Sequence, residues 1–93
     1  MLVDPEQIWR AQAGDLDAFK TIVRAYRPLV LGTLSRLVRP EQAVELGTQV
    51  FLLVHRSLGR LESAQNFEPW LLHLTANAAH AYRRKNVSRT EKD

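Results

Sequence analysis

The stretch NFEPWLLHLTANAAHAYRRKN, residues 66–86, joins a helical apolar pattern to a polar and basic end. Its apolar residues recur at helical spacing and form one stripe: Phe67, Trp70, Leu71 and Leu74. Asn66 stands where a helix cap is expected. The pattern therefore predicts a helix, and two readings of it stay open. It is either a core helix with a solvated end or a surface that holds a flat, negatively charged ligand.

Two further helices are expected at the start of the chain. Asp4 followed by Pro5 is a typical helix start, because a carboxylate caps free N–H groups and proline suits the first turn. Gly14 ends this short helix. A second helix begins at Asp15 or Asp17, and apolar residues continue at helical spacing beyond it.

Proline and glycine also mark the middle of the chain. Pro28 falls inside the second helical pattern and is expected to kink or briefly break it. Pro40 opens a third helix, which stops at Gly59. The polar segment GRLESAQN, residues 59–66, then leads into the fourth. With no stretch of period-two alternation, the sequence predicts an all-α domain of about four helices without internal repeats.

Length and composition fit one small domain, residues 1–86, followed by a basic polar tail over 87–93. The absence of cysteine excludes disulfides and thiolate metal sites. Apolar residues make up 45%, but no run approaches the roughly 18 that a membrane span needs. The N-terminus lacks the order of a signal peptide. We expect a soluble, cytoplasmic domain with no membrane partner.

The charge is concentrated at one end. The net charge is +3, yet the bases Arg83, Arg84, Lys85, Arg89 and Lys92 stand close together with only Glu91 among them. A basic end on a nearly neutral body is compatible with binding to a phosphate backbone. A solvated tail that keeps the chain soluble explains the same charges equally simply.

Catalysis is not supported by any motif. His55, His73 and His80 include no pair three or four residues apart, so no helical face carries two histidines for one metal. There is no glycine-rich phosphate loop, no G-x-S-x-G sequence and no cysteine nucleophile. We predict a binding domain that is not an enzyme and that uses no metal or other cofactor.

The order of motifs resembles the second conserved region of bacterial sigma-70 family factors, and most of all those of the extracytoplasmic-function (ECF) group. The resemblance rests on AQAGDLDAFKTIVRAYRPLV, RPEQAVELGTQVFLLVHRSLGRL and FEPWLLHLTANAAHAYRRK, and covers residues 6–86. The fourth conserved region of such factors has no counterpart in these residues. The resemblance implies a helical domain with two surfaces. The third helix would dock on the clamp helices of the RNA polymerase β′ subunit, and the fourth helix with its preceding loop would capture the single-stranded minus-ten promoter element.

The resemblance implies DNA-binding roles along the fourth helix. The candidates are Trp70, Asn77, His80, Arg83, Arg84 and Lys85. For Trp70 the alternative is packing in the core, and for Asn77 it is a hydrogen bond to another helix. His80 and the neighbouring Tyr82 suit stacking or bonding to a base, or a plain surface position. The segment 61–66, LESAQN, stands where relatives hold the flipped promoter base.

Polymerase docking is expected through Glu45, Gln49 and Phe51. The sequence departs from the family here, because relatives carry a more acidic run before V-F. Gln42, Val44, Thr48 and Gln49 occupy positions where relatives have acidic residues or glutamine, and Gly47 weakens the helix. Fewer carboxylates leave fewer charge-assisted contacts to a basic polymerase surface.

The departures keep a second function open. The main hypothesis is a sigma domain that engages polymerase and opens promoter DNA. The alternative is a sigma-like regulatory or decoy module that binds an anti-sigma factor or another protein. A generic double-strand DNA-binding domain fits less well, since VRPEQAVELGTQVFLLVHR, residues 38–56, lacks helix-turn-helix spacing.

Overall fold

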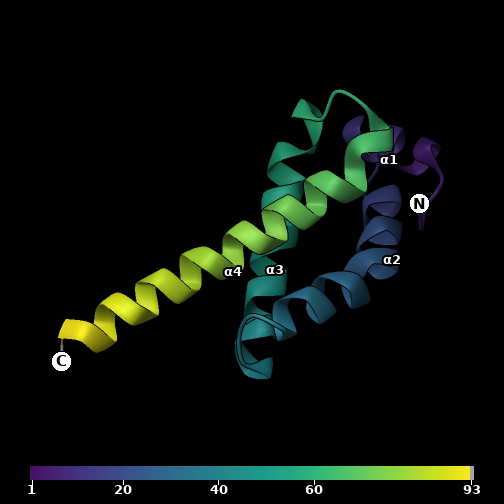
Figure 1. The fold of residues 1–93 in the computed structure, drawn as a ribbon. Coiled ribbons are helices and arrows are strands. Elements are labelled where there is room, and N and C mark those ends of the chain that lie inside the picture. Colours follow the sequence, from purple (N-terminus) through teal and green to yellow (C-terminus); the bar gives the residue numbers. More distant parts are fainter. Residues whose placement is uncertain (93) are drawn as a thin grey trace.

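The computed structural model describes the backbone of residues 1–92 and the side chains of residues 1–86. It contains four α-helices and two short 3-10 turns, and no strand occurs in the described backbone (Figure 1). The elements are α1 (Pro5–Gln12), α2 (Leu16–Ser35), α3 (Pro40–Ser57), η1 (Leu58–Arg60), η2 (Ala64–Asn66) and α4 (Phe67–Lys92). The predicted all-α fold of four helices is confirmed. The predicted basic tail, 87–93, lies outside the residues whose side chains are described.

The first two helices begin as their sequences predict. Asp4 precedes Pro5, and its carboxylate accepts a hydrogen bond from the Glu6 N–H at 3.0 Å. Asp15 caps α2 by accepting from the Ala18 N–H at 3.1 Å, so the second helix begins after Asp15 rather than Asp17. Gly14 lies between the two helices with a φ of 102°, a conformation that side-chain-bearing residues rarely adopt.

Pro28 lies inside α2 without breaking it. The helix is continuous from Leu16 to Ser35, so Pro28 does not interrupt it. The axis of α2 changes direction part-way along its length in Figure 1, which is a bend of the kind that a missing N–H and a bulky ring produce.

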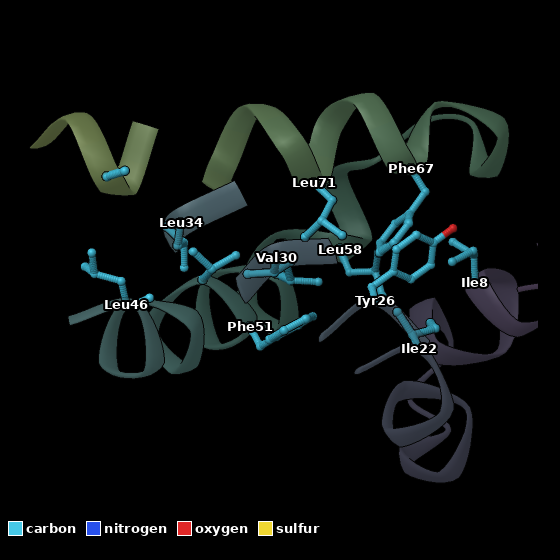
Figure 2. Close-up of a cluster of buried hydrophobic side chains, with 14 of the residues drawn as sticks. Ile8, Ile22, Tyr26, Val30, Leu34, Leu46, Phe51, Leu58, Phe67 and Leu71 are labelled. Carbon is cyan, nitrogen blue, oxygen red and sulfur yellow. The ribbon is translucent and has the colours of Figure 1, made fainter. Parts of the chain in front are cut away.

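The core lies where α4 crosses α2 and α3, and α1 closes one end of it. Phe67 and Leu71 of α4 are fully buried, as are Tyr26 and Ile22 of α2 and Ile8 of α1 (Figure 2). The Phe67 ring meets Tyr26 edge-on with centroids 5.1 Å apart. The apolar stripe predicted from residues 66–86 is therefore the core-facing side of α4.

Tyr26 carries the main polar link inside this core. Its hydroxyl donates to Glu68 Oε2 at 2.8 Å and accepts from the Leu2 N–H at 3.1 Å. Burial, and then the hydrogen bond to the Glu68 carboxylate, raise the pKa of Tyr26 from 10.0 to about 12. The folded state therefore holds the hydroxyl proton more tightly than the unfolded chain does.

We expect stability to fall at alkaline pH because of this hydroxyl. Its contribution is fully present below pH 10 and is lost as pH rises toward about 12, since the unfolded chain releases the proton first. Tyr26→Phe should cost about 1 kcal/mol at neutral pH and should flatten the alkaline decline. Urea unfolding between pH 7 and pH 11 measures both effects. Tyr82→Phe, which removes the other tyrosine hydroxyl, is the matched control; an equal flattening in that variant would contradict the assignment to Tyr26.

Gly47 has a packing role as well as a cost in helix propensity. It is buried where α3 faces α2, and a Cβ built on it would lie 3.1 Å from Leu31 Cδ2. A side chain here would push Leu31 away. The weak helix former predicted from the sequence therefore leaves room for the Leu31 side chain at the contact between α2 and α3.

The two ends of α4 have different surroundings. Most of its length packs on α2 and α3, whereas its C-terminal end extends beyond the other helices (Figure 1). Within the described residues, no helix combines the length and the apolar character that crossing a membrane requires.

Candidate nucleic-acid interface

One side of α4 is exposed along the packed part of the helix. His73, Asn77, His80 and Arg84 follow one another at spacings of four, three and four residues, so they share one face. All four are exposed. Phe67, Leu71 and Thr75 lie on the opposite, buried side. We call the four exposed residues the α4 ridge.

Asn77 takes part in a contact within the ridge. Its amide nitrogen lies 3.1 Å from His73 Nε2, one helical turn away. The alternative of a hydrogen bond to another helix is therefore not what the structure contains. An exposed amide of this kind presents both a donor and an acceptor to a ligand, as recognition of a base edge requires.

Arg83 and Lys85, the other two basic residues predicted to bind DNA, do not lie on the ridge. Arg83 lines a hollow beside the α2–α3 connection, together with Val38, Arg39 and Gln42. Lys85 lies on the side of α4 that faces α3, where it lines a groove between the two helices. Arg83, Arg84 and Lys85 thus point to different sides of α4, because consecutive residues of a helix face different directions. Only Arg84 lies on the same face as Asn77 and His80.

Trp70 lies between core and surface. Its ring is half-buried and packs against Phe67, with ring centroids 5.9 Å apart and a tilt of 52°. The indole therefore contributes to the core, as one reading of the sequence expected, while part of it remains accessible beside the ridge.

The predicted polymerase residues lie on different sides of α3. Glu45 and Gln49 are exposed on one face, at the edge of the groove that Lys85 also lines. Phe51 is only 9% exposed and lines a second groove, between α2 and α3. That groove is mainly apolar, and its rim includes Val44 and Leu52, which are 52% and 55% exposed.

A third hollow lies beside the segment that precedes α4. It runs between α1 and that segment and is lined by Pro5, Trp9, Glu62, Ser63, Ala64 and Gln65. The sequence pattern indicated 61–66 but not Trp9, which is 60% exposed. The one available signal was its position next to Ile8, the buried residue of α1, because adjacent helical residues face different directions.

Gln12 fastens the two walls of this hollow together. Its side-chain nitrogen donates to the carbonyl oxygens of Leu58 at 3.0 Å and Leu61 at 2.9 Å. One amide thus ties the end of α1 to the segment between α3 and α4. Sequence reasoning missed Gln12, since its partners are 46 and 49 residues away.

The described residues include no cluster of three or more histidine, aspartate or glutamate side chains placed to hold a metal ion. In the same part of the chain, every buried side-chain nitrogen or oxygen has a hydrogen-bond partner. The polar groups described above are the exposed amide of Asn77, the imidazoles of His73 and His80, and the guanidinium groups of Arg83 and Arg84. Groups of this kind suit the binding of a polar ligand.

Comparison with known proteins identifies the family. The protein-family model for Sigma-70 region 2 matches residues 22–89 of the sequence, which include most of α2 and all of α3. The chain belongs to the sigma-70 region 2 family. Sigma factors are transcription initiation factors without enzymatic activity, so the prediction that the chain is not an enzyme is confirmed.

Similar proteins are ECF-type sigma factors. The chain is 42% identical over 71 residues to RNA polymerase sigma factor CarQ of Myxococcus xanthus, covering 75% of this chain. It is 31% identical over 77 residues to the RNA polymerase sigma-H factor of Pseudomonas aeruginosa, covering 82%. It is 30% identical over 81 residues to the ECF RNA polymerase sigma-E factor of Haemophilus influenzae, covering 87%. The chain spans 41, 40 and 43% of the lengths of these relatives.

A solved structure has the same fold. It is the NMR structure of an engineered region 2 of sigmaE in complex with GTAAAA, with a TM-score of 0.87 and 27% sequence identity. The match covers 95% of this chain and 93% of that one. The likeness to sigma region 2 expected from the sequence is confirmed for both family and fold.

Proposed function

We propose that this domain binds core RNA polymerase through α3 and captures the non-template strand of the minus-ten promoter element along α4 and the segment 61–66. The observation that carries the proposal is the α4 ridge. It places an amide, two imidazoles and a guanidinium on one exposed face of the helix. Unpaired DNA offers matching chemistry, because its bases stack and its phosphates pair with cations.

Capture of the strand accounts for promoter opening without chemistry. Unstacking a base costs a few kcal/mol, and contacts to the displaced bases and backbone offset that cost. Asn77, His80 and the exposed part of Trp70 supply contacts to bases, and Arg84 supplies a phosphate contact beside them. Arg83 and Lys85 flank the ridge and add positive potential on either side. Support also comes from the structural relative, which was solved in complex with GTAAAA.

Polymerase docking is assigned to the exposed face of α3. Glu45 and Gln49 lie on that face, and the apolar groove between α2 and α3 begins at its edge, at Val44 and Leu52. A helix of the β′ clamp fits such a groove through apolar contacts, while Glu45 adds a charged contact at the rim. Phe51 supports the groove from within, since its ring is nearly buried.

Binding of labelled hexamers tests the proposal. Fluorescence anisotropy is measured with GTAAAA, with a scrambled hexamer and with an abasic hexamer that has the same phosphates. Each is measured with the domain alone and with core polymerase. We expect GTAAAA to bind more tightly than the abasic hexamer, and we expect the affinity to fall as salt rises. Equal affinity for all three hexamers in the presence of polymerase would sink the assignment of base recognition to this domain.

A sigma-like regulatory module remains the second candidate. It is favoured by the exposed face of α3, which carries the uncharged Thr48 and Gln49 beside Glu45 and so offers few carboxylates to a basic polymerase surface. Such a module would bind an anti-sigma factor or another protein and would not discriminate among the hexamers. The same titrations, together with a pull-down of the β′ clamp fragment, separate the two functions.

A further inference from the structure

Trp9 is an exposed aromatic residue that lines the hollow between α1 and the segment 62–65. The indole is 60% exposed, although tryptophan side chains are usually well buried. Across the hollow lie Ser63 and Gln65, whose hydroxyl and amide both donate and accept hydrogen bonds. Pro5 and Ala64 complete the lining with small apolar surfaces. A flat aromatic face opposite polar groups is an arrangement that suits a planar, polar ligand.

The charged groups that line the hollow indicate which part of a nucleotide it would bind. Its one ionisable lining residue is Glu62, and none of its lining residues is basic. A carboxylate repels phosphate and accepts hydrogen bonds from amino groups. The hollow therefore suits the base of a nucleotide better than its backbone, which fits the cationic ridge of α4 instead.

The hollow is also held in shape. Gln12 donates to the Leu58 and Leu61 carbonyls, so α1 and the segment before α4 keep their spacing. The α4 helix begins at Phe67, directly after this segment. A strand that runs along α4 toward its N-terminal end therefore comes to the segment that forms one wall of the hollow.

We propose that Trp9 of α1 is the stacking wall of a single-nucleobase site, whose opposite wall is the segment 62–65. This inference rests on the proposed function and extends it, because the family model begins at residue 22 and does not include α1. The segment before α4 supplies the groups that read the base edge, and α1 supplies the face on which the base lies. Base–aromatic stacking requires only the π-face of the indole, so the wall itself tolerates different bases.

Two variants of Trp9 test the site with GTAAAA and with the abasic hexamer. Trp9→Ala should weaken GTAAAA binding about tenfold, and Trp9→Phe should retain most of the affinity. Neither variant should change binding of the abasic hexamer, because that ligand has no base to stack. Circular dichroism checks that both variants keep the helical content of the parent chain.

A third variant separates the site from the rest of the interface. Gln12→Leu removes the donor that holds α1 to the segment before α4, and it should weaken GTAAAA in the same direction as Trp9→Ala. Wild-type affinity for GTAAAA in a folded Trp9→Ala variant would overturn the stacking wall while leaving the proposed function intact. Failure of the unmodified domain to distinguish GTAAAA from the abasic hexamer would instead overturn the proposed function.

Discussion

Phe67→Ala should destabilise the domain by about 3–5 kcal/mol, the range measured for buried phenylalanines replaced by alanine. Phe67 is fully buried, packs edge-on against Tyr26 and supports the half-buried ring of Trp70. Its removal leaves a cavity at the point where α4 crosses α2. Because a small domain has only about 5–15 kcal/mol of stability, the thermal midpoint should fall by more than about 10 °C.

Leu52→Ala is the matched control for this change. It also shortens a large apolar side chain in a helix, but Leu52 is 55% exposed. We expect a change within about 0.5 kcal/mol, as is usual for surface positions. Urea unfolding of both variants gives the comparison. Equal destabilisation by the two changes would mean that α4 does not provide the centre of the core.

Removal of three positive charges from α4 should have the largest effect on DNA binding. In the variant Arg83→Gln, Arg84→Gln and Lys85→Gln, each side chain is replaced by a shorter, uncharged one of similar helix propensity. Each phosphate contact on single-stranded DNA contributes about 0.7 to the salt slope, so the Arg84 contact alone accounts for about 0.7, and about 2 is the upper limit if Arg83 and Lys85 also pair with phosphates. We expect the slope to fall by up to that amount and the affinity at low salt to fall at least about tenfold.

The matched control removes the same charge from α2. Lys20, Arg24 and Arg27 are exposed and recur at helical spacing, and their replacement by glutamine should leave the salt slope nearly unchanged. Anisotropy titrations of the abasic hexamer at several salt concentrations isolate the contribution of phosphates. A similar loss of slope in both triple variants would indicate a nonspecific effect of net charge rather than a site on α4.

The fold was largely predictable because its signals are local. Capping carboxylates, first-turn prolines and a helix-ending glycine act on their own neighbours, and the apolar stripe of α4 depends only on helical spacing. Pro28 was less predictable, since a proline inside a helix either bends or interrupts it, and the choice depends on tertiary packing. The role of Gly47 was hidden for the same reason, because Leu31 belongs to another helix.

The candidate site was predictable only where it follows one helix. Asn77, His80 and Arg84 share a face because of their spacing, and that spacing is visible in the sequence. Phe51 was grouped with Glu45 and Gln49 by motif, although helical geometry directs its ring toward the groove between α2 and α3. Gln12 bonds to residues about fifty positions away, and Trp9 lines a hollow with residues equally distant in the sequence. No local sequence pattern predicts which distant residues come together in this way.

The walls of the Trp9 hollow come from two elements with different roles in the fold. The segment before α4 continues into the helix that holds the core together, whereas the exposed side of α1 supports little else. A change at Trp9 should therefore alter how tightly any base is stacked, while the groups that read the base edge stay in place on the other wall. In this domain, discrimination and holding strength are separable properties.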